Sequence, residues 1–467
     1  GLYQSGTVAS TYALAASASE IWMPTAASFQ VTGLATSELF LARAFERYGV
    51  QAQYEQRYEY KNAANPYLQA DFTPAHREAT LSWMTSVYEN AIAQAAADRR
   101  KQPAALRAAL EAGPFLSEQA RAQGLIDRIG QVEEAEDAIL KRAGANAELM
   151  DFAEYASARA AARPQTGDAI AIVGGEGPIM TGAGDGGDPF GGGQTMWSDE
   201  IAEAFYDAIE DDSVKAIVFR VSSPGGSDVA SEQIGAALRA AKAAGKPVVV
   251  SMGEYAASGG YWVSADASAI VAHPSTLTGS IGVFVGKFAF GDALARFGVD
   301  SRDLTVGGAY AGAFSSSQGF SPEQRAAVGR WADGIYEAFV QRVANGRKIA
   351  PERVREIARG RVWTGSQAKE LGLVDELGGL YEAVARAKAL AGIDADKDVR
   401  LKRFPEAKSP FEAFASAFGA SADGVKALAA MAWVMGDPRA EAVLDEMAES
   451  RMRERGATVL TTEPLLR

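Results

Sequence analysis

The stretch KPVVVSMGEYAASGGYW, residues 246–262, places a run of valines directly before a turn of small residues. A short, bounded apolar run of this kind is typical of a buried parallel strand. Two similar runs precede it, DAIAIV at 168–173 and KAIVFRV at 215–221. The segments 199–210 and 228–243, which lie between these runs, have helical spacing. Strands that alternate with helices indicate βαβ crossovers, so we predict an α/β fold with a parallel sheet.

The sequence also contains a long internal repeat. FTPAHREATLSWMTSVYENA from Phe72 resembles FSPEQRAAVGRWADGIYEAF from Phe320, at an offset of 248 residues. ARAQGLIDRIG at 120–130 resembles AKELGLVDELG at 368–378 with the same offset. Further upstream the offset becomes 249, which indicates a one-residue deletion in the second copy. We therefore expect two domains of the same fold.

The repeat predicts the domain boundaries. Residues 1–164 form the N-terminal repeat, residues 165–395 the C-terminal repeat, and residues 396–467 a helical C-terminal extension. The first copy starts at the equivalent of the loop before Ser258, so we expect that repeat to be N-terminally incomplete and the chain to be a fragment or a processed form.

Composition excludes several classes of function. The net charge of -13 argues against broad nucleic-acid binding, which needs clustered lysine and arginine. With no cysteine and only two histidines, the chain offers no disulfide, no thiol nucleophile and no cysteine-ligated zinc. We expect no metal and no cofactor. No uncharged apolar run approaches the roughly 20 residues that span a bilayer.

Two further segments give structural expectations. The glycine-rich segment 174–194 is predicted to be a loop without a packed element. A capping box at Ser321, followed by Pro322, predicts a helix with an apolar stripe facing the core. That stripe consists of Val328, Trp331, Ile335, Phe339 and Val343.

Ser258 is the candidate nucleophile. It follows the valine strand and stands where a helix is expected to begin, so a developing oxyanion would meet the positive end of the helix dipole. The backbone N–H of Gly259 would lie at the same place. The alternative is that Ser258 is only a helix N-cap, a far commoner role for serine.

A second turn supports the catalytic interpretation. RVSSPGGS at 220–227 ends a neighbouring strand, and ligands gather outside the carboxyl ends of parallel strands. Gly226 in this turn could donate a second N–H to an oxyanion. The base is harder to identify, because neither His76 nor His273 has an acidic partner at a recognisable spacing. Lys61, between aromatic and small residues, could serve if burial lowers its pKa, although a surface lysine is the safer interpretation of composition alone.

Taken together, the motifs RVSSPGGS, YAASGGYWVSADA, STLTGSIGV and YEYKNAANPY and the tandem repeat resemble the long form of signal peptide peptidase A. This is a family of bacterial membrane-associated serine proteases in the ClpP/crotonase-like superfamily. The resemblance implies two tandem ClpP/crotonase-like repeats, with Ser258 as nucleophile and Lys61 as general base. It also implies that Ser280 orients the lysine and that Gly226 and Gly259 form the oxyanion hole.

The resemblance further implies hydrolysis of cleaved signal peptides and other small, apolar-rich peptides at the bacterial inner membrane. The catalytic domain is expected to face the periplasm or the outside. A homotetramer is expected, with membrane association through a segment absent from this chain. Asn62 and Asn65 depart from the family's usual lysine segment. Two alternatives remain open, a crotonase-like acyl-CoA enzyme and a non-catalytic scaffold.

Overall fold

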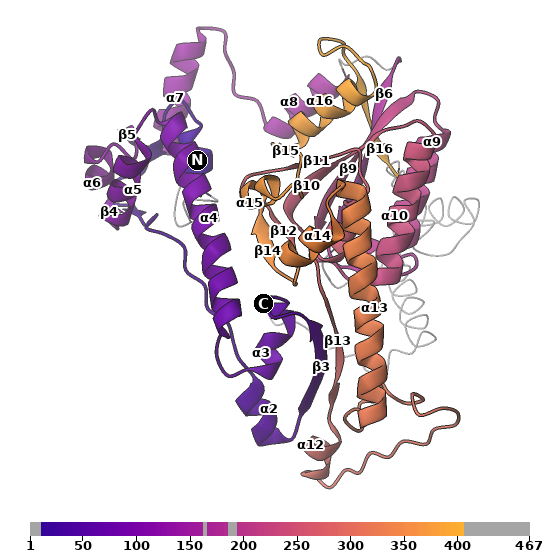
Figure 1. Ribbon diagram of the computed structural model, residues 1–467. Coiled ribbons are helices and arrows are strands. Elements are labelled where there is room, and N and C mark those ends of the chain that lie inside the picture. The colour runs from indigo at the N-terminus through magenta and orange to yellow at the C-terminus, as the bar shows by residue number, and fades with distance from the viewer. Residues whose placement is uncertain (1–10, 162–165, 185–193, 406–467) are drawn as a thin grey trace, which may run out of the picture. The chain divides into compact units, whose positions relative to one another are not determined.

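The computed structural model describes residues 11–161, 166–184 and 194–405 (Figure 1). Within these residues the second repeat is built around an eight-stranded sheet. Its main path runs β14-β12-β10-β9-β6-β16. Off this path, β11 pairs with β10, and β15 pairs with β11. Every pair in this sheet is parallel except β12 with β14. The predicted α/β class with a mostly parallel sheet is confirmed.

The three predicted strands and the two helices between them are present with nearly the expected bounds. The strands of the sheet are β6 Ala169–Glu176, β9 Val214–Ser223, β10 Val248–Ala257, β11 Ala269–Ala272, β12 Leu277–Gly279, β14 Val362–Thr364, β15 Glu376–Leu377 and β16 Arg400–Phe404. The helices of this repeat are α9 Ser198–Glu210, α10 Asp228–Ala243, α11 Gly259–Trp262, α12 Gly291–Ala295, α13 Pro322–Arg347, α14 Pro351–Ile357, α15 Gly365–Glu370 and α16 Leu380–Leu390.

Helices cover both faces of the sheet, as a buried parallel sheet requires. Side chains of successive β9 residues point to opposite faces, so Phe219 packs edge-on against Phe205 of α9 while Val218 packs with Ala383 of α16. The larger core also includes residues of α10, α11 and α13. The central strands of the sheet are therefore covered on both faces, and their carboxyl ends are available to form a site.

The first repeat contributes a smaller helical module with its own core. Its helices are α1 Ala13–Ala16, α2 Ala42–Tyr48, α3 Asn65–Leu68, α4 Pro74–Asp98, α5 Pro103–Glu111, α6 Ser117–Ala122, α7 Val132–Ala143 and α8 Phe152–Ala161. Its strands are β1 Trp22–Met23, β2 Ser28–Phe29, β3 Gln51–Arg57, β4 Phe115–Leu116 and β5 Arg128–Ile129. None of the helices in the described part of the chain is long and apolar enough to cross a membrane.

Matching hydrogen bonds show that the two repeats share a local structure. The carboxylate of Asp127 accepts the backbone N–H of Ile21 at 2.8 Å, and that of Asp375 accepts the N–H of Ile270 at 2.7 Å. The two aspartates are related by the sequence offset of 248, and the two isoleucines by the upstream offset of 249. The parallel pair β1 with β5 likewise corresponds to β11 with β15. The internal repeat predicted from the sequence is thus a structural repeat.

A two-stranded ribbon joins the repeats. Strand β3 pairs antiparallel with β13, Val283–Ala289, over seven residues, from Arg57 with Val283 to Gln51 with Ala289 (Figure 1). The ribbon also packs against α13. Because β3 belongs to the first repeat and β13 to the second, the ribbon fixes the place of the residues that follow β3.

The structure corrects three expectations. The glycine-rich segment contains β7 Ile179–Met180, which pairs with β8 Met196–Trp197 and bridges to Gly226, while residues 185–193 lie outside the description. Residues 400–404, at the start of the expected helical extension, form the edge strand β16, and residues 406–467 lie outside the described part. The capping box of α13 is confirmed, but Trp331 is 45% exposed and does not belong to the core stripe.

Candidate active site

The candidate site lies at the carboxyl ends of adjacent strands. Ser258 directly follows β10 and Ser280 directly follows β12, and these strands pair in parallel with Ala257 opposite Gly279. The backbone N–H of Ser258 donates to the carbonyl of Gly279 at 2.9 Å. Lys61 follows β3, so the ribbon brings it to the same edge of the sheet. Three segments that are distant in the sequence therefore meet at one point.

The side-chain nitrogen of Lys61 contacts both serines. Its Nζ lies 3.1 Å from Ser258 Oγ, 3.0 Å from Ser280 Oγ and 2.9 Å from the carbonyl oxygen of Ser280. A neutral lysine has two N–H bonds and one lone pair. Ser280 offers two acceptors for those N–H bonds, which leaves the lone pair directed at the hydroxyl of Ser258. The arrangement suits proton transfer from serine to lysine.

Burial makes the ammonium form of Lys61 a strong enough acid to lose its proton near neutral pH. The residue is 3% exposed, and desolvation lowers the pKa of its side chain to about 7. None of the ion pairs within the described ranges includes Lys61, so no carboxylate restores the charged form. Gly360 permits this burial, because a Cβ at that position would lie 2.5 Å from the Cβ of Lys61.

Both serines have unusual backbone conformations. Ser258 has φ 54° and ψ -119°, and Ser280 has φ 49°. A positive φ on a residue with a side chain costs roughly 1–3 kcal/mol, and such strain often marks functional positions. Ser258 precedes α11, yet its side chain makes no capping hydrogen bond to that helix. The simple N-cap interpretation of Ser258 therefore does not fit the structure.

Gly226 and Gly259 lie beside Ser258. Among the described residues, no acceptor takes the backbone N–H of either glycine. The two turns are in close contact, since a Cβ on Gly225 would lie 2.6 Å from the nitrogen of Gly259 and 2.7 Å from the Cβ of Ser258. A Cβ on Gly259 would lie 3.1 Å from the nitrogen of Gly226. Two free donors thus lie close together next to Ser258.

The histidines are placed elsewhere. His76 pairs with Glu38 at 3.2 Å and packs on Phe40 and Phe72, so it does have an acidic partner that its sequence neighbourhood does not reveal. His273 accepts the backbone N–H of Ser275 at 3.2 Å, which is the role of a turn residue. Neither histidine has a hydrogen bond to Ser258.

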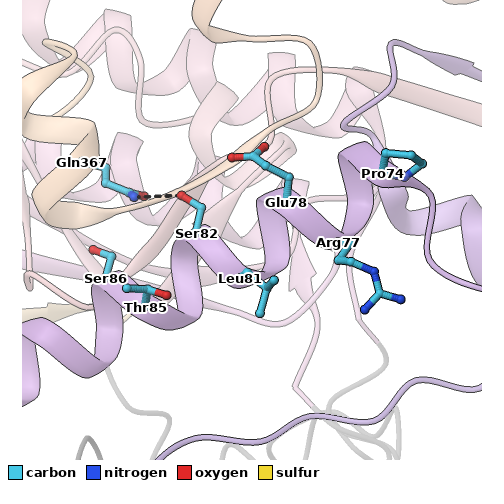
Figure 2. Close-up of a pocket in the computed structure, with 8 residues that line it drawn as sticks. All are labelled: Pro74, Arg77, Glu78, Leu81, Ser82, Thr85, Ser86 and Gln367. Atoms are coloured by element: carbon cyan, nitrogen blue, oxygen red, sulfur yellow. Dashed lines mark hydrogen bonds between the residues drawn. The ribbon is translucent and has the colours of Figure 1, made fainter.

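A groove of about 740 Å³ runs along α4 and is closed on one side by Gln367 of α15 (Figure 2). Ser82 accepts a hydrogen bond from Gln367 across it at 3.2 Å. None of Ser258, Lys61 and Ser280 lines this groove. Its link to the site is indirect, through the ion pair between Glu78 and Arg361. The carbonyl of Arg361 accepts the N–H of Ser280 at 2.7 Å.

Comparison with known proteins identifies the family of this chain. The sequence pattern of peptidase family S49 matches residues 3–146 and 240–394, which together cover more than half of the chain. The chain belongs to peptidase family S49. The match falls in two segments, one in each repeat, and it includes Lys61, Ser258 and Ser280.

Several S49-type relatives align over most of this chain. Protease 4 from Salmonella typhi is 37% identical, covering 81% of this chain and 62% of its own length. Protease 4 from Haemophilus influenzae is 30% identical, covering 83% and 64%. Serine protease SPPA, chloroplastic, from Arabidopsis thaliana is 28% identical, covering 89% and 61%. The chain therefore spans a little over three fifths of the length of these relatives. The matches confirm the family resemblance predicted from the motifs.

Proposed function

We propose that this protein is a serine endopeptidase in which Ser258 is the nucleophile and Lys61 the general base. The observation that carries the proposal is the 3.1 Å separation between Lys61 Nζ and Ser258 Oγ, with the lysine buried and its pKa lowered to about 7. A serine hydroxyl attacks a carbonyl only when a nearby base removes its proton. Lys61 is placed and tuned for that task at neutral pH.

The reaction follows from these positions. Neutral Lys61 takes the proton of Ser258 as the serine oxygen bonds to the carbonyl carbon of the substrate peptide. The tetrahedral intermediate then collapses, the C–N bond breaks, and the lysine ammonium protonates the leaving amine. Water attacks the resulting ester with Lys61 again acting as base. This step releases the carboxylate product and restores the serine.

Two further groups support the transition state. The free N–H groups of Gly226 and Gly259 would hold the oxyanion of the tetrahedral intermediate. Removal of one such donor in other enzymes lowers kcat by about 10²–10³-fold. Ser280 would keep the lysine amine oriented through its hydroxyl and its carbonyl. A crotonase-like acyl-CoA reaction could use the same oxyanion donors, but it gives no reason to bury a lysine against the serine.

The family resemblance supports a finer proposal for the biological role. We infer that the substrates are cleaved signal peptides and other small, apolar-rich peptides at the bacterial inner membrane. The active form would be a homotetramer whose catalytic domain faces the periplasm or the outside.

Labelling with a fluorophosphonate probe tests the catalytic proposal. The wild-type protein should label, whereas Ser258→Ala and Lys61→Ala should not. Lys287→Met is the matched control, because Lys287 is also buried but donates to the carbonyls of Ser315 and Gln318. That variant should label like the wild type. Labelling of Ser258→Ala at the wild-type rate would rule out the assigned nucleophile.

A further inference from the structure

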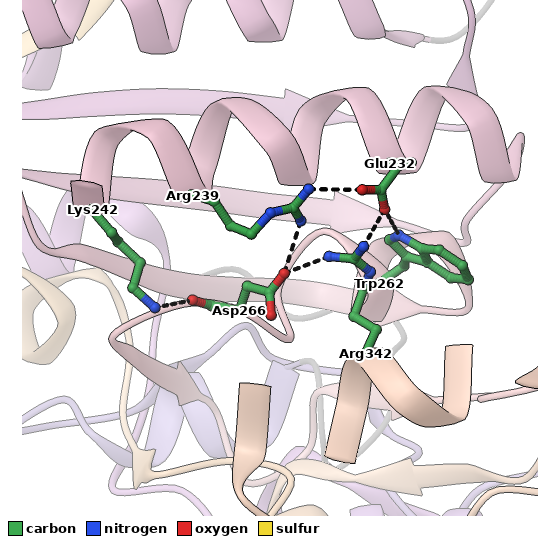
Figure 3. A network of polar contacts seen from close by, with 6 residues as sticks. All are labelled: Glu232, Arg239, Lys242, Trp262, Asp266 and Arg342. Carbon is green, nitrogen blue, oxygen red and sulfur yellow. Dashed lines mark hydrogen bonds and ion pairs between the residues drawn. The ribbon is translucent and has the colours of Figure 1, made fainter. Parts of the chain in front are cut away.

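A group of four charged side chains and one tryptophan, called here the charge cluster, connects α10, α11 and α13 (Figure 3). It consists of Glu232, Arg239, Trp262, Asp266 and Arg342. Glu232 pairs with Arg239 and Arg342, and Asp266 pairs with the same two arginines. Each acid therefore bridges both bases, and the four charges cancel.

The charge cluster ties together the two elements that present the oxyanion donors. Helix α10 begins two residues after Gly226, and α11 begins with Gly259. Glu232 of α10 accepts the indole N–H of Trp262 in α11 at 3.1 Å. This bond links α10, which follows Gly226, to α11, which begins with Gly259.

Helix α13 completes the connection. Its Arg342 pairs with Glu232 of α10 and with Asp266 beyond α11, and its guanidinium lies 5.2 Å from the centre of the Trp262 ring. Phe339 of the same helix packs on Trp262 at 4.8 Å between ring centres. One long helix thus holds both shorter elements.

The cluster is only partly shielded from solvent, since the side chains of Arg239 and Glu232 are 38% and 43% exposed. The side chains of Arg342 and Asp266 are each 15% exposed. Burial acts to raise the pKa of Glu232, but the hydrogen bond from Arg239 and the positive charge of Arg342 lower it below its ordinary value. These partners favour the charged form of Glu232, and removal of one of them would leave a partly buried charge without its partner.

The glycine turns leave little tolerance for movement. A Cβ on Gly259 would lie only 2.6 Å from the hydroxyl of Ser231, the residue that precedes Glu232. The distance between α10 and α11 at this point therefore sets the separation of the two oxyanion donors. A change in that distance would misplace both N–H groups relative to Ser258.

The two repeats share one ion pair of the fold, but they do not share the charge cluster. Arg347 of α13 pairs with Asp375, and the first repeat retains that pair as Arg99 with Asp127. The cluster positions are not retained. At the same offsets, Trp262, Asp266 and Arg342 correspond to Ala13, Ser17 and Gln94. The copy with alanine in place of the nucleophile thus also lacks the cluster residues that can be aligned.

We propose that the charge cluster is a positioning device that sets the geometry of the oxyanion hole by clamping α10 and α11 to α13. The inference rests on the proposed peptidase function. No side chain of the charge cluster is hydrogen-bonded to Ser258 Oγ or to Lys61, and the backbone N–H of Trp262 donates to the carbonyl of Ser258 at 2.9 Å. The cluster residues therefore act by placing the backbone of the two turns that hold Gly226, Ser258 and Gly259.

The test compares Arg342→Gln with Arg347→Gln. Both arginines lie on α13 and form ion pairs that the substitution removes. Only Arg342 belongs to the charge cluster. Steady-state hydrolysis of an internally quenched peptide rich in alanine and leucine gives kcat and KM, and thermal unfolding gives Tm. Amide hydrogen exchange of the segments 225–227 and 259–262 reports on the two turns whether or not the protein is active.

Arg342→Gln should lower kcat by about 10- to 100-fold with KM changed less than about threefold, because misplaced donors weaken transition-state binding. The pH midpoint of kcat should stay unchanged, since Arg342 does not contact Lys61. Both glycine segments should exchange faster. Arg347→Gln should lower Tm but keep kcat within about threefold of the wild type.

Equal losses of kcat in the two variants, or unchanged exchange of both glycine segments in Arg342→Gln, would overturn the positioning role. Failure of the proposed function looks different. In that case the wild-type protein and Ser258→Ala would show the same hydrolysis, and the exchange comparison would still decide whether the cluster holds the two turns.

Discussion

Replacement of Lys61 by methionine should make the protein more stable, by an amount that depends on pH. Burial lowers the pKa of Lys61 to about 7, against roughly 10.4 for a lysine in the unfolded chain. This difference corresponds to about 4–5 kcal/mol of unfolding free energy that the wild type loses at low pH. Methionine fills a similar volume, has no charge to desolvate, and avoids that loss.

The direction of the pH dependence follows from proton uptake. Between pH 7 and roughly 10.4 the unfolded chain carries a proton on Lys61 that the folded protein lacks. Unfolding therefore takes up a proton, and the unfolding free energy of the wild type rises with pH in this window. Lys61→Met lacks this dependence. Its stability advantage should be largest below pH 7 and should shrink by about 3 kcal/mol between pH 7 and pH 9.5.

Urea unfolding at pH 6, 7, 8, 9 and 9.5 measures this difference, because all other groups titrate alike in both proteins. The same pKa governs catalysis, so the rate of fluorophosphonate labelling of the wild type should rise about tenfold from pH 6 to pH 8 and then level off. A stability difference that is constant from pH 7 to pH 9.5 would refute the desolvated lysine. A labelling rate that keeps rising beyond pH 9 would refute it as well.

Three other predictions concern single substitutions. Ser280→Ala should lower kcat by about 10-fold or more and move the midpoint of the pH profile down, because the hydroxyl no longer accepts from the ammonium of Lys61; an unchanged profile would count against its role. Gly259→Ala should lower kcat by about 10²-fold with little change in KM, since its Cβ would lie 2.6 Å from the Ser231 hydroxyl; a matching rise in KM would contradict this. Asp127→Asn should cost about 1–3 kcal/mol in urea unfolding without affecting kcat, because it weakens a bidentate ion pair beside the separate core of the first repeat, with no bond to the site residues; an unchanged midpoint would contradict that.

The parts of the fold set by local patterns could be predicted from the sequence. The valine strand, the two predicted helices 199–210 and 228–243 and the capping box of α13 each have a strong local signal, and the structure contains all of them with nearly these bounds. Strand β16 was missed because its sequence, Arg-Leu-Lys-Arg-Phe, has three charges and no β-branched residue. Its pairing with β6 gives it a strand conformation that its own composition does not favour.

The residues of the candidate site could likewise be predicted only in part from local sequence patterns. The turns around Ser258 and Gly226 could be selected from the strands that precede them. The approach of Lys61 could not be derived from local patterns, because it depends on the ribbon formed by β3 and β13. Strand β3 reads Gln-Ala-Gln-Tyr-Glu-Gln-Arg, which lacks the apolar alternation of a typical half-buried strand. The charge cluster was also missed, since its members are spread from Glu232 to Arg342 and meet only in the folded protein.

The ribbon between the repeats also has a consequence for biosynthesis. The lysine and the serine are 197 residues apart in the chain, and β13 is completed only after the serine. During translation the first repeat emerges with a lysine that has no serine to activate. When the serine follows, the lysine reaches it only after β13 has paired with β3. In the proposed mechanism the site of a nascent chain would therefore be complete only once β13 has been synthesised and the two repeats have folded together.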